Sequence, residues 1–231
     1  MSIVFFFLFL CSAFSEPLSY RNELLGHSIT GRPIYGEFIG EGTEKILFVA
    51  GVHGNEWVGT PLLFRLRQYM LDHPEILTEK QVILIPMLNP DGWVDDMRSN
   101  RKRVDLNRNF PSENYGRGLT GDNPLSEPES KILFDVINTV RPTRIIGIHQ
   151  PFTCVDYDGK ESEELAKIMS EKSGLPIKKL GVRSGSLGAY VQKKYPLITL
   201  EMKFSDHEKP MEYIWTRYGE ALISAISYTS K

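Results

Sequence analysis

The chain has 231 residues, which is long enough for one well-buried α/β domain and short for two. Its formal net charge of −2, from 27 Lys and Arg against 29 Asp and Glu, gives no reason to expect binding to nucleic acid or to an anionic membrane. Hydrophobic residues make up 41% of the chain, an ordinary fraction for a globular protein.

The first feature along the chain is an apolar run over residues 3–14. It is too short to span a bilayer as a helix. It is typical of a signal peptide, and Ala13-Phe14-Ser15 resembles a cleavage site, although no Lys or Arg precedes the run. We therefore expect residues 1–15 to direct export and residues 16–231 to form the mature domain. The alternative is a buried N-terminal segment in a cytoplasmic protein.

Predicted strands and helices alternate along the rest of the chain. Short apolar runs predict strands over residues 35–39, 45–50, 82–86, 143–149 and 197–201. Apolar residues three or four apart predict helices over residues 58–71, 126–140, 161–174, 186–194 and 211–229, with Ser126 as the cap of the second. We expect residues 35–39 to form an edge strand and residues 41–44 a hairpin turn. Residues 89–123 are predicted to be a long polar loop.

This alternation predicts a single α/β domain. Its sheet should be mixed, mostly parallel and twisted, with helices covering both faces. In such sheets functional sites gather at the carboxyl ends of the strands. His53, His149 and Glu201 all lie at or just beyond predicted strand ends.

The segment Val52-His53-Gly54-Asn55-Glu56 is the first candidate for metal binding. An imidazole and a carboxylate three residues apart can point at one ion, and both suit zinc. The spacing occurs by chance in many proteins, so in isolation an ordinary loop is the better interpretation. His149 changes this interpretation because it supplies a third ligand.

His53, Glu56 and His149 together would form a zinc site with a position left for water, which is the catalytic rather than the structural arrangement. We expect one zinc ion per chain. Zinc polarises a carbonyl and lowers the pKa of water. Glu201 follows an apolar strand and is the candidate base that accepts the water's proton and passes it to the leaving amine. Without the three ligands, it would be interpreted as a solvent-facing glutamate.

The predicted loop carries candidates for anion binding. Arg98 could stabilise the oxyanion of a tetrahedral intermediate. Asn107 and Arg108 place an amide beside a guanidinium, a pair suited to a substrate carboxylate. Asp105 is well placed to orient a ligand histidine. The alternative is an ordinary solvated basic loop.

Six short segments, HGNE, NPDG, the arginine of RSN, VDLNRNFP, HQP and ITLE, resemble in their order the zinc metallocarboxypeptidase (M14) superfamily, from about residue 26 to residue 201. The resemblance implies a zinc carboxypeptidase-like catalytic domain over residues 16–231. It also implies site roles: zinc ligands His53, Glu56 and His149, base Glu201, oxyanion electrophile Arg98, carboxylate-binding Asn107 and Arg108, and Asp105 as the partner of His53.

The pattern HQP followed by Asp156-Tyr157-Asp158-Gly159 is most similar to the bacterial murein peptide amidase branch. Members of that branch cleave the γ-D-glutamyl–diaminopimelate bond of peptidoglycan peptides. The resemblance implies a small peptide substrate such as murein tripeptide, and a periplasmic enzyme if the signal is cleaved. Two departures stand out. Arg103 replaces the glycine that often precedes VDLNR, and residues 178–185 lack the tyrosine that digestive carboxypeptidases bring over the substrate.

Two other functions stay open on the sequence alone. The first is a zinc deacylase of N-acyl amino acids, because the aspartoacylase-like branch shares HGNE and DLNR; NPDG and the predicted signal favour the peptidase. The second is a catalytically silent module that binds cell-wall peptides, against which the complete set of ligands and base argues.

Overall fold

The computed structural model describes residues 18–113, 115–116, 120–159 and 161–229. The predicted signal segment, residues 1–15, lies outside the described residues. Apolar, β-branched runs form the centre of the sheet, and they are buried on both faces as parallel strands in α/β proteins are. Four parallel strands lie here in the order β4-β3-β5-β7: β3 (Glu44–Val49), β4 (Lys80–Ile85), β5 (Arg144–His149) and β7 (Leu197–Lys203).

Antiparallel strands extend this parallel centre on both sides. β1 (Tyr20–His27) pairs with β2 (Pro33–Ile39), β2 pairs with β4, and β6 (Phe152–Asp158) pairs with β7. The edge strands are therefore β1 and β6, and the prediction that residues 35–39 lie at an edge is wrong. The predicted hairpin turn at residues 41–44 is also wrong, because β4 lies between β2 and β3.

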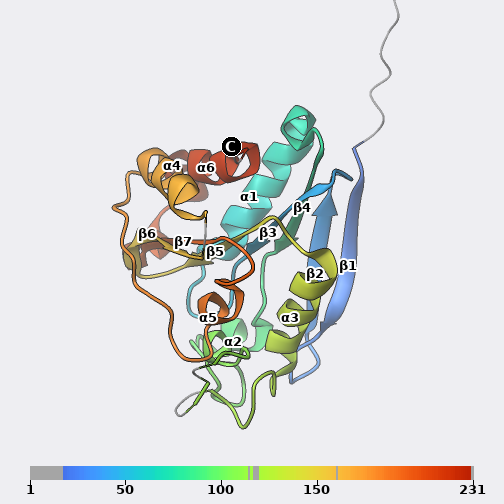
Figure 1. Cartoon of the computed structure of the whole chain (residues 1–231), viewed down its shortest axis with the longest axis vertical. Coiled ribbons are helices and arrows are strands. Elements are labelled where there is room, and N and C mark those ends of the chain that lie inside the picture. The colour runs from blue at the N-terminus through green and yellow to red at the C-terminus, as the bar shows by residue number, and fades with distance from the viewer. Residues whose placement is uncertain (1–17, 114, 117–119, 160, 230–231) are drawn as a thin grey trace, which may run out of the picture.

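Helices cover both faces, as predicted (Figure 1). On one face α1 (Gly59–Asp72), α4 (Glu163–Ser173) and α6 (Met211–Ser227) pack their apolar sides on the sheet. On the other face α3 (Pro128–Val140) and the short α5 (Leu187–Val191) do the same. Sequence and structure thus agree on a mixed, mostly parallel sheet between two helical layers.

The predicted helices are found within a few residues of their expected bounds, but two details differ. The residue before α3 is Glu127, and Ser126 binds the Glu127 carboxylate rather than capping the helix. The predicted loop contains α2 (Pro90–Val94) and a 3₁₀ turn, η2 (Leu106–Arg108). Two more 3₁₀ turns are η1 (Pro74–Leu77) and η3 (Phe204–Glu208). Among the described residues, no helix is long and apolar enough to cross a membrane.

Candidate active site

The loop after β3 is held in place by the segment that follows β4. The Asn89 backbone N–H donates to the Gly51 carbonyl (2.8 Å), and the Asn89 amide donates to the Val52 carbonyl (3.4 Å). Gly54 packs directly on Gly92, where a Cβ on residue 54 would lie 1.9 Å from the Gly92 carbonyl carbon. The NPDG segment therefore supports the loop that carries His53 and Glu56 and does not itself reach the pocket.

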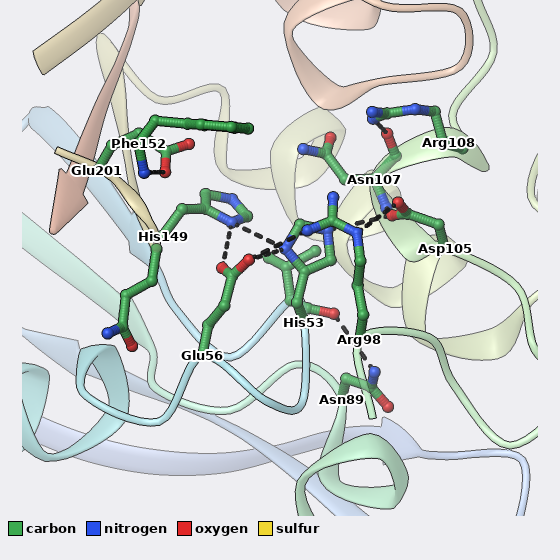
Figure 2. Close-up of polar contacts among 12 residues, drawn as sticks. His53, Glu56, Asn89, Arg98, Asp105, Asn107, Arg108, His149, Phe152 and Glu201 are labelled. Atoms are coloured by element: carbon green, nitrogen blue, oxygen red, sulfur yellow. Dashed lines mark hydrogen bonds and ion pairs between the residues drawn. The ribbon is translucent and has the colours of Figure 1, made fainter. Parts of the chain in front are cut away.

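His53, Glu56 and His149 converge at the carboxyl ends of β3 and β5 (Figure 2). His53 Nδ1 lies 2.7 Å from Glu56 Oε1, and His149 Nδ1 lies 2.8 Å from Glu56 Oε2 and 3.2 Å from His53 Nδ1. All three residues are buried. The three side chains that the sequence predicted as ligands are therefore brought together from segments almost 100 residues apart.

The chemistry of this donor set fits zinc. Two ring nitrogens and a carboxylate offer ligand atoms that all lie within 4.8 Å of one another. Zinc–nitrogen bonds of about 2.0–2.1 Å place tetrahedral ligand atoms roughly 3.3 Å apart, close to the separation of the two Nδ1 atoms. These are three ligands rather than four, as in catalytic zinc sites.

The electrostatics of the cluster also favour a cation. Burial would raise the pKa of Glu56, but His53 and His149 hold it well below its usual range. Burial would lower the pKa of His53, yet the carboxylates of Glu56 and Asp105 raise it above its usual value. The cluster thus attracts positive charge, and a divalent cation could take the place of the protons that it would otherwise hold.

Asp105 fixes the ring of His53. Its Oδ1 lies 3.1 Å from His53 Nε2 and accepts the Asn107 backbone N–H (2.9 Å), while its Oδ2 accepts the Arg98 Nε–H (3.0 Å). With Nε2 directed at this carboxylate, His53 can offer an unprotonated Nδ1 to a metal ion in the cluster.

We predict that Asp105→Asn lowers zinc affinity by about 10- to 100-fold, because an amide binds the Nε2–H less strongly than a carboxylate does. Titration of zinc against a competing chelator measures the change. Asp72→Asn, at the exposed end of α1, is the matched control and keeps the wild-type affinity. Equal zinc affinity in wild type and Asp105→Asn contradicts the assigned role.

Glu201 lines the same pocket as the three candidate ligands. It lies opposite His149 in the β5–β7 pairing, and its Oε2 accepts a long hydrogen bond from the Phe152 N–H (3.4 Å; Figure 2). Burial raises its pKa above the ordinary value, which the nearby His149 opposes only in part. A buried carboxylate with a raised pKa beside the cluster is suited to accept and return a proton.

The basic residues form the other wall of the pocket. Arg98 donates from Nη1 to Glu56 Oε1 (3.3 Å) and from Nε to Asp105 Oδ2. Among the described contacts of Arg98, none involves Nη2. The Asn107 Oδ1 accepts the Leu187 N–H (2.8 Å), which leaves the amide nitrogen on the pocket side (Figure 2). Each residue predicted to bind anions is thus at the pocket.

Arg108 completes a concentration of positive charge. Burial lowers the pKa of its guanidinium, and Arg98 and Arg183 lower it further while Asp105 opposes them. Its Nη1 donates to the Asn107 carbonyl (2.5 Å). Three neighbouring guanidinium groups make this wall a natural place for a carboxylate.

Several pocket residues were not predicted from the sequence as site residues. They come mainly from β6, which was not predicted as a strand, and from α5 and the segment before it: Phe152, Asp156, Asp158, Arg183 and Gly188. Carboxylates at alternate positions, 156 and 158, were a usable signal, since alternate residues of a strand face the same side.

Comparison with known proteins agrees with this geometry. Residues 13–153 match the model of the M14 peptidase family, zinc carboxypeptidase. The chain is 31% identical to murein peptide amidase A of Escherichia coli (strain K12) over an alignment of 173 residues, which covers 67% of this chain and 69% of that protein. It is 30% identical to murein peptide amidase A of Vibrio campbellii, over 80% of this chain and 79% of that protein.

The fold comparison gives the same result. The crystal structure of murein-tripeptide amidase MpaA from Escherichia coli O157 superposes with a TM-score of 0.73 at 25% sequence identity, covering 91% of this chain and 93% of that one. Family match, sequence identity and fold therefore coincide over most of the chain. The protein belongs to the M14 zinc carboxypeptidase family and is a hydrolase of peptide bonds.

Proposed function

We propose that this protein is a zinc-dependent amidase that removes the C-terminal residue from peptidoglycan-derived peptides by hydrolysing the γ-D-glutamyl–diaminopimelate bond. The observation that carries the proposal is the convergence of His53, Glu56 and His149 in one pocket with Glu201 and the basic wall. Similarity to two murein peptide amidases supports the peptidoglycan substrate. The same proposal keeps residues 1–15 as an export signal and the mature chain as periplasmic.

In this proposal His53, Glu56 and His149 hold the zinc ion. Bound zinc would supply Lewis acidity, which polarises a carbonyl and lowers the pKa of water so that a hydroxide-like nucleophile is accessible at neutral pH. Glu201 takes a proton from the attacking water and gives it to the nitrogen of the leaving residue. Asp105 keeps the His53 ring oriented throughout.

The basic wall binds the charges of the substrate and of the transition state. Asn107 and Arg108 hold the C-terminal carboxylate, which puts the preceding amide bond beside Glu201. Arg98 directs its available Nη2 at the oxyanion that forms on the attacked carbonyl. Its contacts with Glu56 and Asp105 hold the guanidinium in place, so little reorientation is needed when the charge appears.

The test is product analysis with the zinc-loaded chain on murein tripeptide. We expect mass spectrometry to find free diaminopimelate and the remaining dipeptide, and we expect the tripeptide with a C-terminal carboxamide to be a poor substrate. N-acyl amino acids serve as the competing substrates. Hydrolysis of those alone makes the chain a deacylase, and tight binding of tripeptide without turnover makes it a binding module; either result overturns the proposal.

A further inference from the structure

The pocket continues beyond Glu201 to two aspartates that have no role in the proposed mechanism. Asp156 and Asp158 lie two residues apart on β6 and pair with Thr199 and Leu197 of β7, on the face of the sheet that also carries Glu201. Strand residues rise about 3.3 Å each, so the two pairs lie ~7 Å and ~13 Å along the sheet from the Glu201 level.

Asp158 is not paired with a cation among the described residues. Only 8% of the residue is exposed, and Asp158 forms no hydrogen bond or ion pair with any residue that the structure describes. The pKa of Asp158 is raised to about 6 because burial and the neighbouring Asp156 both raise it, while the exposed Lys179 opposes them. A cation that enters the pocket therefore stabilises the charged form of this buried carboxylate.

Asp156 is tied to the backbone. Its Oδ1 accepts the Leu180 N–H (2.8 Å), which ties down the segment before α5, and burial raises its pKa as well. Asp156 therefore has a structural role that Asp158 lacks. The two carboxylates nevertheless line one wall of the pocket and repel each other electrostatically.

The turn of α5 that covers this end of the pocket is built around the aspartate. A Cβ on Gly188 would lie 2.4 Å from Asp158 Oδ2, so a larger residue would push the carboxylate aside. The preceding residue, Leu187, donates its N–H to Asn107 Oδ1. One short helix thus contacts both Asn107 and Asp158, and it holds the positive and the negative ends of the pocket at a fixed separation.

We infer that Asp156 and Asp158 bind the side-chain ammonium of the leaving amino acid and so select a diamino acid. The inference rests on the proposed function, because it assumes that Asn107 and Arg108 hold the carboxylate of that same residue. Diaminopimelate and lysine share the side-chain ammonium and differ in a second carboxylate, for which Arg183 lies at the pocket wall. Either amino acid meets the requirement, and the experiment separates them.

The test uses four γ-D-glutamyl dipeptides with the zinc-loaded full chain. The leaving residues form two pairs, diaminopimelate with 2-aminopimelate and lysine with norleucine, and each pair differs only in the ammonium. We expect the wild type to prefer the ammonium-bearing member by about 10- to 100-fold in kcat/KM in at least one pair, as for a hydrogen-bonded charge. Asp158→Asn brings that ratio close to one, mainly by lowering kcat/KM on the ammonium-bearing member. Asp135→Asn, exposed on α3, controls for the lost charge and keeps the ratio.

The pH dependence of the ratio gives a second readout. Among the described residues, the charged groups that face Asp158 are Asp156 and Lys179, while α5 and β7 present Gly188 and Leu197, which do not titrate. The carboxylate is charged above its pKa of about 6 and neutral below it. The wild-type ratio therefore rises with pH through about 6, and the Asp158→Asn ratio stays flat. Because each pair shares one catalytic centre, effects of Glu201 cancel in the ratio.

The possible failures can be told apart. If the wild type hydrolyses none of the four dipeptides, the proposed function fails, and calorimetric titration of free lysine against free norleucine still decides the inference. Equal binding or equal hydrolysis of paired ligands by the wild type overturns the inference alone. So does an Asp158→Asn variant that loses activity equally on both members of a pair, since that result marks a structural role. Asp156→Asn, with its thermal midpoint recorded, repeats the test at the second carboxylate.

Discussion

Glu201→Gln is expected to reduce kcat on murein tripeptide by about 10³-fold, within the range that positioned acid–base groups contribute. Glutamine has the same shape and can still accept the Phe152 N–H, so the strand end stays in place. It cannot take a proton from water at neutral pH. Because Glu201 is not among the three candidate ligands, zinc content and KM should change little.

The measurement is steady-state kinetics by chromatography of released diaminopimelate, with zinc determined in the same samples. Glu212→Gln, exposed on α6, removes the same charge far from the pocket and should retain wild-type kcat. A Glu201→Gln variant with full activity would show that another group moves the proton. A variant that has lost its zinc would mean instead that Glu201 belongs to the metal site.

The metal cluster was predictable from the sequence because its members follow the strongest signals in the chain. β3, β5 and β7 are continuous apolar runs, and parallel strands bring their carboxyl ends to one edge of the sheet. Any polar residue directly after such runs must lie near the others. This rule predicts that His53, His149 and Glu201 lie close together.

The edge strands were not predictable because their residues lack that signal. Most of β1 is exposed, so its sequence YRNELLGH has neither an apolar run nor a clean alternation. β6 carries Asp156 and Asp158 at pocket-facing positions, and aspartate is uncommon in strands. The strand β6 and the pocket residues Asp156 and Asp158 were missed for the same reason. The two aspartates make this part of the pocket acidic, and they also weaken the sequence pattern by which β6 would be predicted as a strand.

Removal of zinc is the second large effect that we expect. Chelation should abolish hydrolysis, by at least about 10³-fold, because both the activation of water and the polarisation of the carbonyl depend on the ion. The chain itself should stay folded. His53, Glu56 and His149 pair with one another through charge-assisted hydrogen bonds, and the cores on both faces of the sheet do not depend on the cluster.

Bound zinc should also stabilise the folded state. A ligand that binds only the folded state at about 1,000 times its Kd stabilises that state by about 4 kcal/mol. For a domain of this size, that corresponds to a rise in thermal midpoint of roughly 8–16 °C. Calorimetric scans of chelated and zinc-reloaded protein, with activity recovered on reloading, measure both quantities.

Substitution of a candidate ligand tests whether zinc acts by binding at this cluster or elsewhere on the protein. His149→Ala leaves a site of two ligands, so zinc should no longer raise its thermal midpoint or support turnover. His73→Ala removes an exposed imidazole beyond the end of α1 and should respond to zinc as the wild type does. If zinc raises the midpoint of His149→Ala as much as that of the wild type, the ion binds elsewhere. The convergence of the three buried side chains would then be an ion-paired cluster that only supports the fold.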